Sequence, residues 1–154
     1  MKQLIDPLAR RLRLMVSRAV VRLVNDATKT QTMQVEILKD EVYSAIERLQ
    51  EYGFTSVPKA GAEAVVLSLN GDRGHGVVIV AADKRYRLTG LESGEVALHD
   101  DQGQSIIIKR TGIEITSSMG VDINSPTLEH NGVNIGATHT HISATPGNPS
   151  SIPS

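Results

Sequence analysis

The stretch G-I-E-I-T-S-S-M-G-V-D-I-N, residues 112–124, alternates apolar and polar residues on both sides of a short Ser- and Gly-containing turn. Successive side chains of an extended chain point to opposite faces, so Ile113 and Ile115 share one face and Glu114 lies on the other. A strand of about three to five residues cannot bury one thin apolar face within a single chain, since even a two-stranded hairpin is marginal alone. We therefore expect these faces to pack against copies of the same chain.

The same pattern extends through the second half of the chain, from about Tyr86 onward. Turn residues there separate very short extended runs, which read Y-R-L-T, E-V-A-L, S-I-I-I-K, I-E-I-T, V-D-I-N, T-L-E-H and V-N-I. Three identical chains wound around a common axis would bring the Ile and Val faces together and pair the exposed strand edges between chains. The sequence therefore predicts a threefold β-prism in this half.

The first half has the pattern of a small β-barrel. Four apolar or alternating runs bounded by polar or Gly-containing turns predict strands at 17–24, 32–38, 64–69 and 76–81. Residues 42–54, V-Y-S-A-I-E-R-L-Q-E-Y-G-F, fit either a helix or a fifth strand. Four or five short strands of this kind favour an OB-like barrel.

Two polar stretches that resemble catalytic or binding motifs are better interpreted as hairpin turns. N-G-D-R-G-H-G, residues 70–76, lacks the Lys-Ser/Thr pair of a P-loop and lies between two strand-like runs, so His75 is predicted to be a turn residue. Asp100 and Asp101 precede S-I-I-I in D-D-Q-G, which is typical of a turn. We therefore do not expect them to form a catalytic carboxylate pair.

Composition narrows the function classes. The 154 residues include no Cys, no Trp, one Phe and three Tyr, and the formal net charge is -1. The absence of Cys excludes disulfides and thiolate metal sites. A nucleic-acid platform normally combines a basic groove with several aromatic residues, and neither is present in quantity. No nucleic-acid partner is expected.

The N-terminal segment does not have the pattern of a targeting signal. In M-K-Q-L-I-D-P-L-A-R-R-L-R-L-M-V the arginines at 10, 11 and 13 interrupt the apolar residues, and no run approaches the roughly 18 apolar residues of a membrane span. We expect a soluble product made in the cytoplasm. The apolar residues fall near helical spacing, which favours a short docking or capping helix over a membrane-surface helix.

His139 and His141 bracket Thr140 just before a Pro-, Gly- and Ser-rich tail. In an extended segment both imidazoles would lie on one face. On a threefold axis three such pairs supply six nitrogens, the number that an octahedral ion requires. The tail cannot continue a sheet, which places the pair at the end of the prism. Two exposed or internally satisfied histidines remain the alternative interpretation.

Four segments also carry a family resemblance that covers nearly the whole chain. They are F-T-S-V-P-K-A-G-A-E-A-V-V-L (54–67), H-G-V-V-I-V-A-A-D-K-R-Y-R-L (75–88), G-E-V-A-L-H-D-D-Q-G-Q (94–104) and the H-T-H of 139–141. With these the chain resembles the membrane-piercing spike, or baseplate assembly protein V, family of contractile-tailed bacteriophages, and in particular the phage Mu type of spike.

The resemblance implies an all-β structural protein of the virion rather than an enzyme. An N-terminal OB-fold barrel would seat a homotrimer on the baseplate hub protein, an intertwined trimeric β-helix would form a shaft, and a pointed apex would hold one iron ion per trimer. His139 and His141 are the residues that match the apex motif as metal ligands. The spike would be made in the host cytoplasm, lie at the tail baseplate tip, and pierce the host outer membrane without binding it stably.

Together these interpretations divide the chain into four parts. They are an N-terminal segment, predicted to be helical, at 1–15; an OB-fold domain at 16–87; a trimeric β-helix shaft at 88–130; and an apex with the metal site at 131–154. Iron follows from the resemblance, because six nitrogens would also suit nickel or cobalt. A metal-dependent hydrolase and a trimeric glycan-binding fibre are the alternatives in function. The first needs an open coordination position, and the second needs aromatic residues for sugar stacking.

Overall fold

The computed structural model describes residues 9, 12, 14–72, 74–137 and 139. Most of the predicted N-terminal segment 1–15 and the whole tail after His139 lie outside the described residues. Of the N-terminal segment, the described residues Ala9, Leu12 and Leu14 are α-helical, as expected from the sequence. The rest of the described part is β-structure with one short 3-10 helix: β1 (Val16–Asn25), β2 (Thr32–Leu38), β3 (Glu41–Arg48), β4 (Glu63–Ser68), η1 (Leu69–Gly71), β5 (Gly76–Ala82), β6 (Val96–His99), β7 (Ser105–Lys109), β8 (Gly112–Thr116), β9 (Glu129–His130) and β10 (Val133–Asn134).

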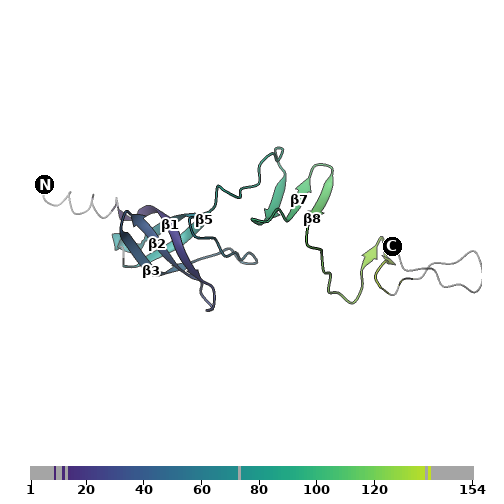
Figure 1. Ribbon diagram of the computed structural model, residues 1–154, viewed down its shortest axis with the longest axis horizontal. Helices are drawn as coiled ribbons and strands as arrows, with labels where there is room; N and C mark the ends of the chain where they lie inside the picture. The colour runs from purple at the N-terminus through teal and green to yellow at the C-terminus, as the bar shows by residue number, and fades with distance from the viewer. Residues whose placement is uncertain (1–8, 10–11, 13, 73, 138, 140–154) are drawn as a thin grey trace, which may run out of the picture.

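The first five strands form a closed barrel in the order β1-β2-β3-β5-β4. Strand β1 pairs antiparallel with both β2 and β4, and a short parallel pairing of β3 with β5 joins the two sides (Figure 1). The four strands expected in this half are confirmed. The segment whose type was open, 42–54, is strand β3 as far as Arg48 and a loop thereafter.

The barrel core consists of aliphatic side chains and one methionine. Strand β4 shows why, because its residues alternate strictly between half-buried and buried. Gly76 permits close packing, since a Cβ there would lie 3.1 Å from Val66 and 3.3 Å from Ile46. The buried hydrophobic residues are Ala19, Val21, Met33, Val35, Ile46, Ala62, Ala64, Val66 and Val78. All of them belong to the barrel, so the described structure has one core.

Strand β5 contains a bulge. Val66 pairs with Val78 while the preceding residue, Val65, pairs with Val80, so Ile79 is the extra residue in the ladder. A bulge interrupts the alternation of side chains and redirects them. Ile79 and Val80 are consequently both exposed, at 43% and 48%. The outer wall of the barrel thus carries two adjacent aliphatic side chains.

The second half contains a three-stranded antiparallel sheet, β6-β7-β8, and a two-stranded hairpin, β9-β10, both distinct from the barrel (Figure 1). Strands were expected at E-V-A-L, S-I-I-I-K, I-E-I-T, T-L-E-H and V-N-I, and each run contains one, although the last two are only two residues long. The runs Y-R-L-T and V-D-I-N are not paired as strands within the described single chain. Their pairing with other copies of the chain stays a prediction.

Both hairpin turns expected from polar motifs are confirmed. Residues 70–76 connect the antiparallel strands β4 and β5, and His75 Nδ1 lies 2.9 Å from the carboxylate of Asp72 within this turn. The Asp100 carboxylate accepts hydrogen bonds from the backbone N–H groups of Gln102 and Gln104, both at 2.9 Å, in the turn between β6 and β7.

Among the described residues, no helix is long and apolar enough to cross a membrane.

Candidate assembly face and tip

One face of the β6-β7-β8 sheet consists of two rows of aliphatic residues. The register of the strands sets these rows across the sheet: Val96, Ile108 and Ile113 form one, and Leu98, Ile106 and Ile115 form the other. Their exposed fractions are 58%, 52% and 70% in the first row and 54%, 43% and 60% in the second. We call these six residues the apolar face.

The opposite side of the same sheet is mixed. It carries a row of Ala97, Ile107 and Glu114, and the Glu114 carboxylate accepts a hydrogen bond of 2.5 Å from Lys109 Nζ. This bond lowers the pKa of Glu114 and raises that of Lys109. The sheet thus has one mixed side, which includes an ion pair, and one apolar side that has no cover within the described chain.

The core stops well before this sheet begins. No residue after Val78 is buried among those that the structure describes. An exposed patch of six large aliphatic side chains on a regular sheet is unusual for a monomeric protein, where such patches mark interaction sites. The apolar face is therefore the strongest candidate for a functional surface in the second half.

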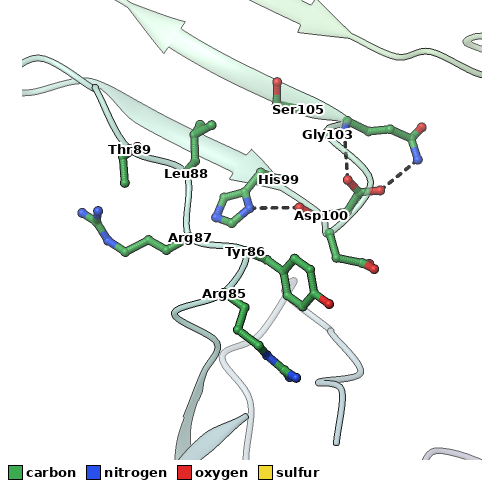
Figure 2. Close-up of a pocket in the computed structure, with 11 residues that line it drawn as sticks. Arg85, Tyr86, Arg87, Leu88, Thr89, His99, Asp100, Gly103 and Ser105 are labelled. Atoms are coloured by element: carbon green, nitrogen blue, oxygen red, sulfur yellow. Dashed lines mark hydrogen bonds between the residues drawn. The ribbon is translucent and has the colours of Figure 1, made fainter. Parts of the chain in front are cut away.

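A cluster of charged residues around Tyr86 joins the barrel to the sheet. Lys59, from the loop before β4, forms an ion pair with Asp101 in the β6–β7 turn, and this hydrogen bond raises the pKa of Lys59. The Lys59 Nζ and the Arg85 guanidinium lie 5.3 and 5.4 Å from the centre of the Tyr86 ring. Figure 2 shows this ring between Arg85 and the turn that carries Asp100. We call Lys59, Arg85, Tyr86 and Asp101 the junction clasp.

The clasp is anchored on the barrel side by Arg85. Its guanidinium donates to the carboxylate of Asp83, at 2.6 and 2.8 Å, and to the carbonyl of Ala60 at 2.9 Å. The hydrogen bond to Arg85 holds the pKa of Asp83 below its usual range. Sequence patterns did not reveal this cluster, because Lys59 and Asp101 are 42 residues apart and each is unremarkable alone.

The predicted metal ligands lie at and just beyond the end of the described chain. After the β9-β10 hairpin, the Asn134 side chain accepts a hydrogen bond from Gly136 N–H at 2.8 Å. The Gly136 carbonyl in turn accepts one from His139 Nδ1 at 2.6 Å and one from His139 N–H at 3.0 Å. His141 lies outside the described residues. The part of the chain that the structure describes contains no group of three metal-binding side chains.

The position of His139 is compatible with a ligand role. A carbonyl can only accept, so Nδ1 carries the proton and the lone pair belongs to Nε2. Metal-bound histidines usually have this arrangement, in which a second hydrogen bond fixes the tautomer and the orientation of the ring. The orientation of His139 thus fits the chemistry of a histidine metal site.

Comparison with known proteins relates the chain to one family. Residues 18–85 match the family described as Bacteriophage Mu Gp45, N-terminal. The chain is 41% identical over 123 residues to the "Baseplate puncturing device gp45" of Escherichia phage Mu, which covers 80% of this chain and 62% of that protein. It is 42% identical over 127 residues to the "Mu-like prophage FluMu protein gp45" of Haemophilus influenzae, covering 82% of this chain and 69% of that protein. The chain thus spans less than two thirds of the phage Mu protein.

Proposed function

The chain belongs to the bacteriophage Mu Gp45 family, and on this premise we propose that it is a structural protein of the virion. In this proposal it forms the central spike at the tip of the tail baseplate and pierces the host outer membrane during infection. The name of the phage Mu relative, a baseplate puncturing device, supports the proposal. The resemblance to baseplate spikes seen in the sequence points to the same role.

The observation that carries the proposal is the apolar face. A spike must be stiff along its axis, and a lone three-stranded sheet with one uncovered side is not stiff. Copies of the chain placed with their apolar faces together would bury six aliphatic residues each, and full burial of one such side chain contributes roughly 1.5–3 kcal/mol. Three copies around one axis close such an arrangement without leaving an exposed edge.

The proposed trimer has the four parts expected from the sequence. Residues 16–87 form an OB-fold domain, a proposal supported by the closed five-stranded barrel. Residues 88–130 form the intertwined β-helix shaft, 131–154 the apex, and 1–15 an N-terminal segment. The barrel end seats the trimer on the baseplate hub protein. The other end meets the host outer membrane, which it crosses without remaining bound, and no nucleic acid is involved.

At the apex we propose one iron ion per trimer, held by His139 and His141 of three chains. The hydrogen bond from His139 Nδ1 to the Gly136 carbonyl supports this role, because it orients the ring and presents Nε2. A bound ion would tie the three chain ends together and resist fraying under load. The proposal includes no enzymatic activity, since a spike of this kind needs only mechanical work from the contracting tail.

The test uses phage particles whose only copy of the spike carries Ile113→Asp or, as a second variant, His139→Ala. We expect particles with a defective spike to adsorb to host cells but to leave the outer membrane closed to a hydrophobic dye that it normally excludes. Purified wild-type protein should release no fragments from peptidoglycan or polysaccharide. Dye entry at the wild-type rate with both variants, or cell-wall degradation by the pure protein, would contradict the proposal.

A further inference from the structure

A groove of about 950 Å³ runs between the barrel and the β6-β7-β8 sheet. Its barrel wall contains the two bulge residues Ile79 and Val80, and a second wall comes from the loop after β3 with Leu49 and Phe54. Leu98 of β6 contributes the third side. The walls are mainly apolar, and all five of these residues are more than 40% exposed.

Two features hold the walls of the groove in place. The junction clasp fixes the turn after β6 against the barrel through the ion pair of Lys59 and Asp101. The loop after β3 is held by Arg48, whose guanidinium donates to the Ser56 carbonyl at 2.7 Å and to the Gln31 side chain at 2.9 Å. The groove is thus a preformed surface with fixed sides, of the kind that binds a partner without large rearrangement.

The groove is continuous with the apolar face. Leu98 belongs to both, since it stands in the row with Ile106 and Ile115 and also lines the groove. A partner that covers the apolar face therefore reaches the edge of the groove without crossing charged surface. The bulge in β5 provides the complementary barrel surface, because regular alternation would have exposed only one of Ile79 and Val80.

From this continuity we propose that a neighbouring copy of the chain fills the groove, so that the barrel wall as well as the sheet belongs to the interface between subunits. The inference rests on the proposed trimer and extends it from the sheet to the barrel. The occupant is a second copy of this chain because the groove opens directly onto a face that the proposed assembly already covers with a neighbour. Each barrel is then fixed to an adjacent subunit, and tail force acting on the barrels passes to the shaft through this contact.

The chain has no native Cys, so single cysteines report on accessibility without background. We compare Val80→Cys, and Ile79→Cys as a second variant, with the control Leu23→Cys. Leu23 is 63% exposed on β1, a strand that does not pair with β5. In the purified trimer the groove thiols should react with a thiol reagent at least about tenfold more slowly than the control thiol, because access requires local opening. Introducing Ile113→Asp, which separates the subunits, should restore the rate at position 80 to that of Leu23→Cys.

The other outcomes of these measurements distinguish a failure of the proposed trimer from a failure of the groove proposal. If light scattering shows no assembly of the unmodified chain, the proposed trimer fails and the groove proposal fails with it. If the trimer forms and the groove thiols react as fast as the control, the groove proposal is wrong while the trimer stands. Protection that persists in the separated chain would mean that the chain covers its own groove. Protection found only in assembled particles would assign the groove to another baseplate protein. Protection in the separated chain and protection only in particles would each overturn the inference.

Discussion

Ile106 and Ile115 are direct partners in the antiparallel pairing of β7 and β8, and both side chains remain exposed, at 43% and 60%. A cross-strand pair of β-branched residues normally stabilises a sheet by packing against each other and against a covering layer. The described chain contains the pair of Ile106 and Ile115, but no layer of side chains within it covers them. The proposed trimer supplies this missing layer.

Replacing Ile113 by Asp should dissociate the assembly. Each copy would have to bury a carboxylate in an apolar interface, and the penalty for burying an unpaired charge is on the order of several kcal/mol. The mass measured by light scattering should fall to that of a single chain. Glu114→Gln is the matched control, because Glu114 is on the same strand but on the opposite side of the sheet. An Ile113→Asp protein that keeps the mass of the wild type would show that the apolar face is not the interface.

Replacing His139 or His141 by Ala should remove the metal from the tip. Either change deletes three of the six proposed nitrogens at once, and the remaining ion would be open to water and to chelators. The trimer should persist, because the apolar face holds it independently. Elemental analysis of purified protein measures the metal per chain, with His130→Ala on the β9-β10 hairpin as control. Full metal content in either variant would mean that these histidines are not the ligands.

Gln31→Ala should destabilise the barrel. The side chain is 5% exposed, and its amide donates to Asp26 at 2.6 Å and to the Ser56 carbonyl at 3.0 Å while accepting from Arg48. Burial already lowers the pKa of Arg48, so this guanidinium would lose a partner in a poorly solvated place. Leaving such groups unpaired costs about 1–3 kcal/mol.

Urea unfolding at fixed chain concentration measures the effect of Gln31→Ala on stability. The control is Gln34→Ala, because the Gln34 side chain makes one exposed hydrogen bond, of 3.1 Å to Ser44. Equal urea midpoints for the two variants would show that the Gln31 network does not stabilise the barrel.

Stability should fall in acid partly through Glu63. Hydrogen bonds from Lys84 at 2.7 Å and Arg18 at 2.6 Å lower the pKa of this carboxyl in the folded protein. Its contribution is therefore complete above the unfolded value of roughly 4.3 and is lost as the pH falls through the lower folded value. Glu63→Gln, which carries no titrating carboxyl, should lose less stability than the wild type between neutral pH and about pH 3. Parallel losses in the two proteins would exclude this role.

The barrel was largely predictable from the sequence, and its one ambiguous element shows where pattern reading fails. Residues 42–54 fit both a helix and a strand because β3 does not alternate regularly. The register shifts between Tyr43 and Ile46, and Ala45 has a positive φ of 58°. Such a bulge breaks the period of two on which strand prediction depends.

In the second half, the expected runs form strands only where the same chain supplies a neighbouring strand. V-D-I-N alternates as clearly as I-E-I-T, yet only the latter pairs, because Gly112–Thr116 follows directly on β7. The junction clasp and the Gln31 network could not be predicted, since they join residues 42 and 17 positions apart that have no shared motif. Likewise, the bulge that exposes Ile79 and Val80 depends on pairing with β4 rather than on their own sequence.

The solution mass of the unmodified chain, measured by light scattering over a range of concentrations, tests the central claim most directly. The account predicts a single species of three times the chain mass of 16.6 kDa that persists on dilution, because the apolar face has no cover within one chain. A folded, monodisperse monomer at micromolar concentration would contradict it.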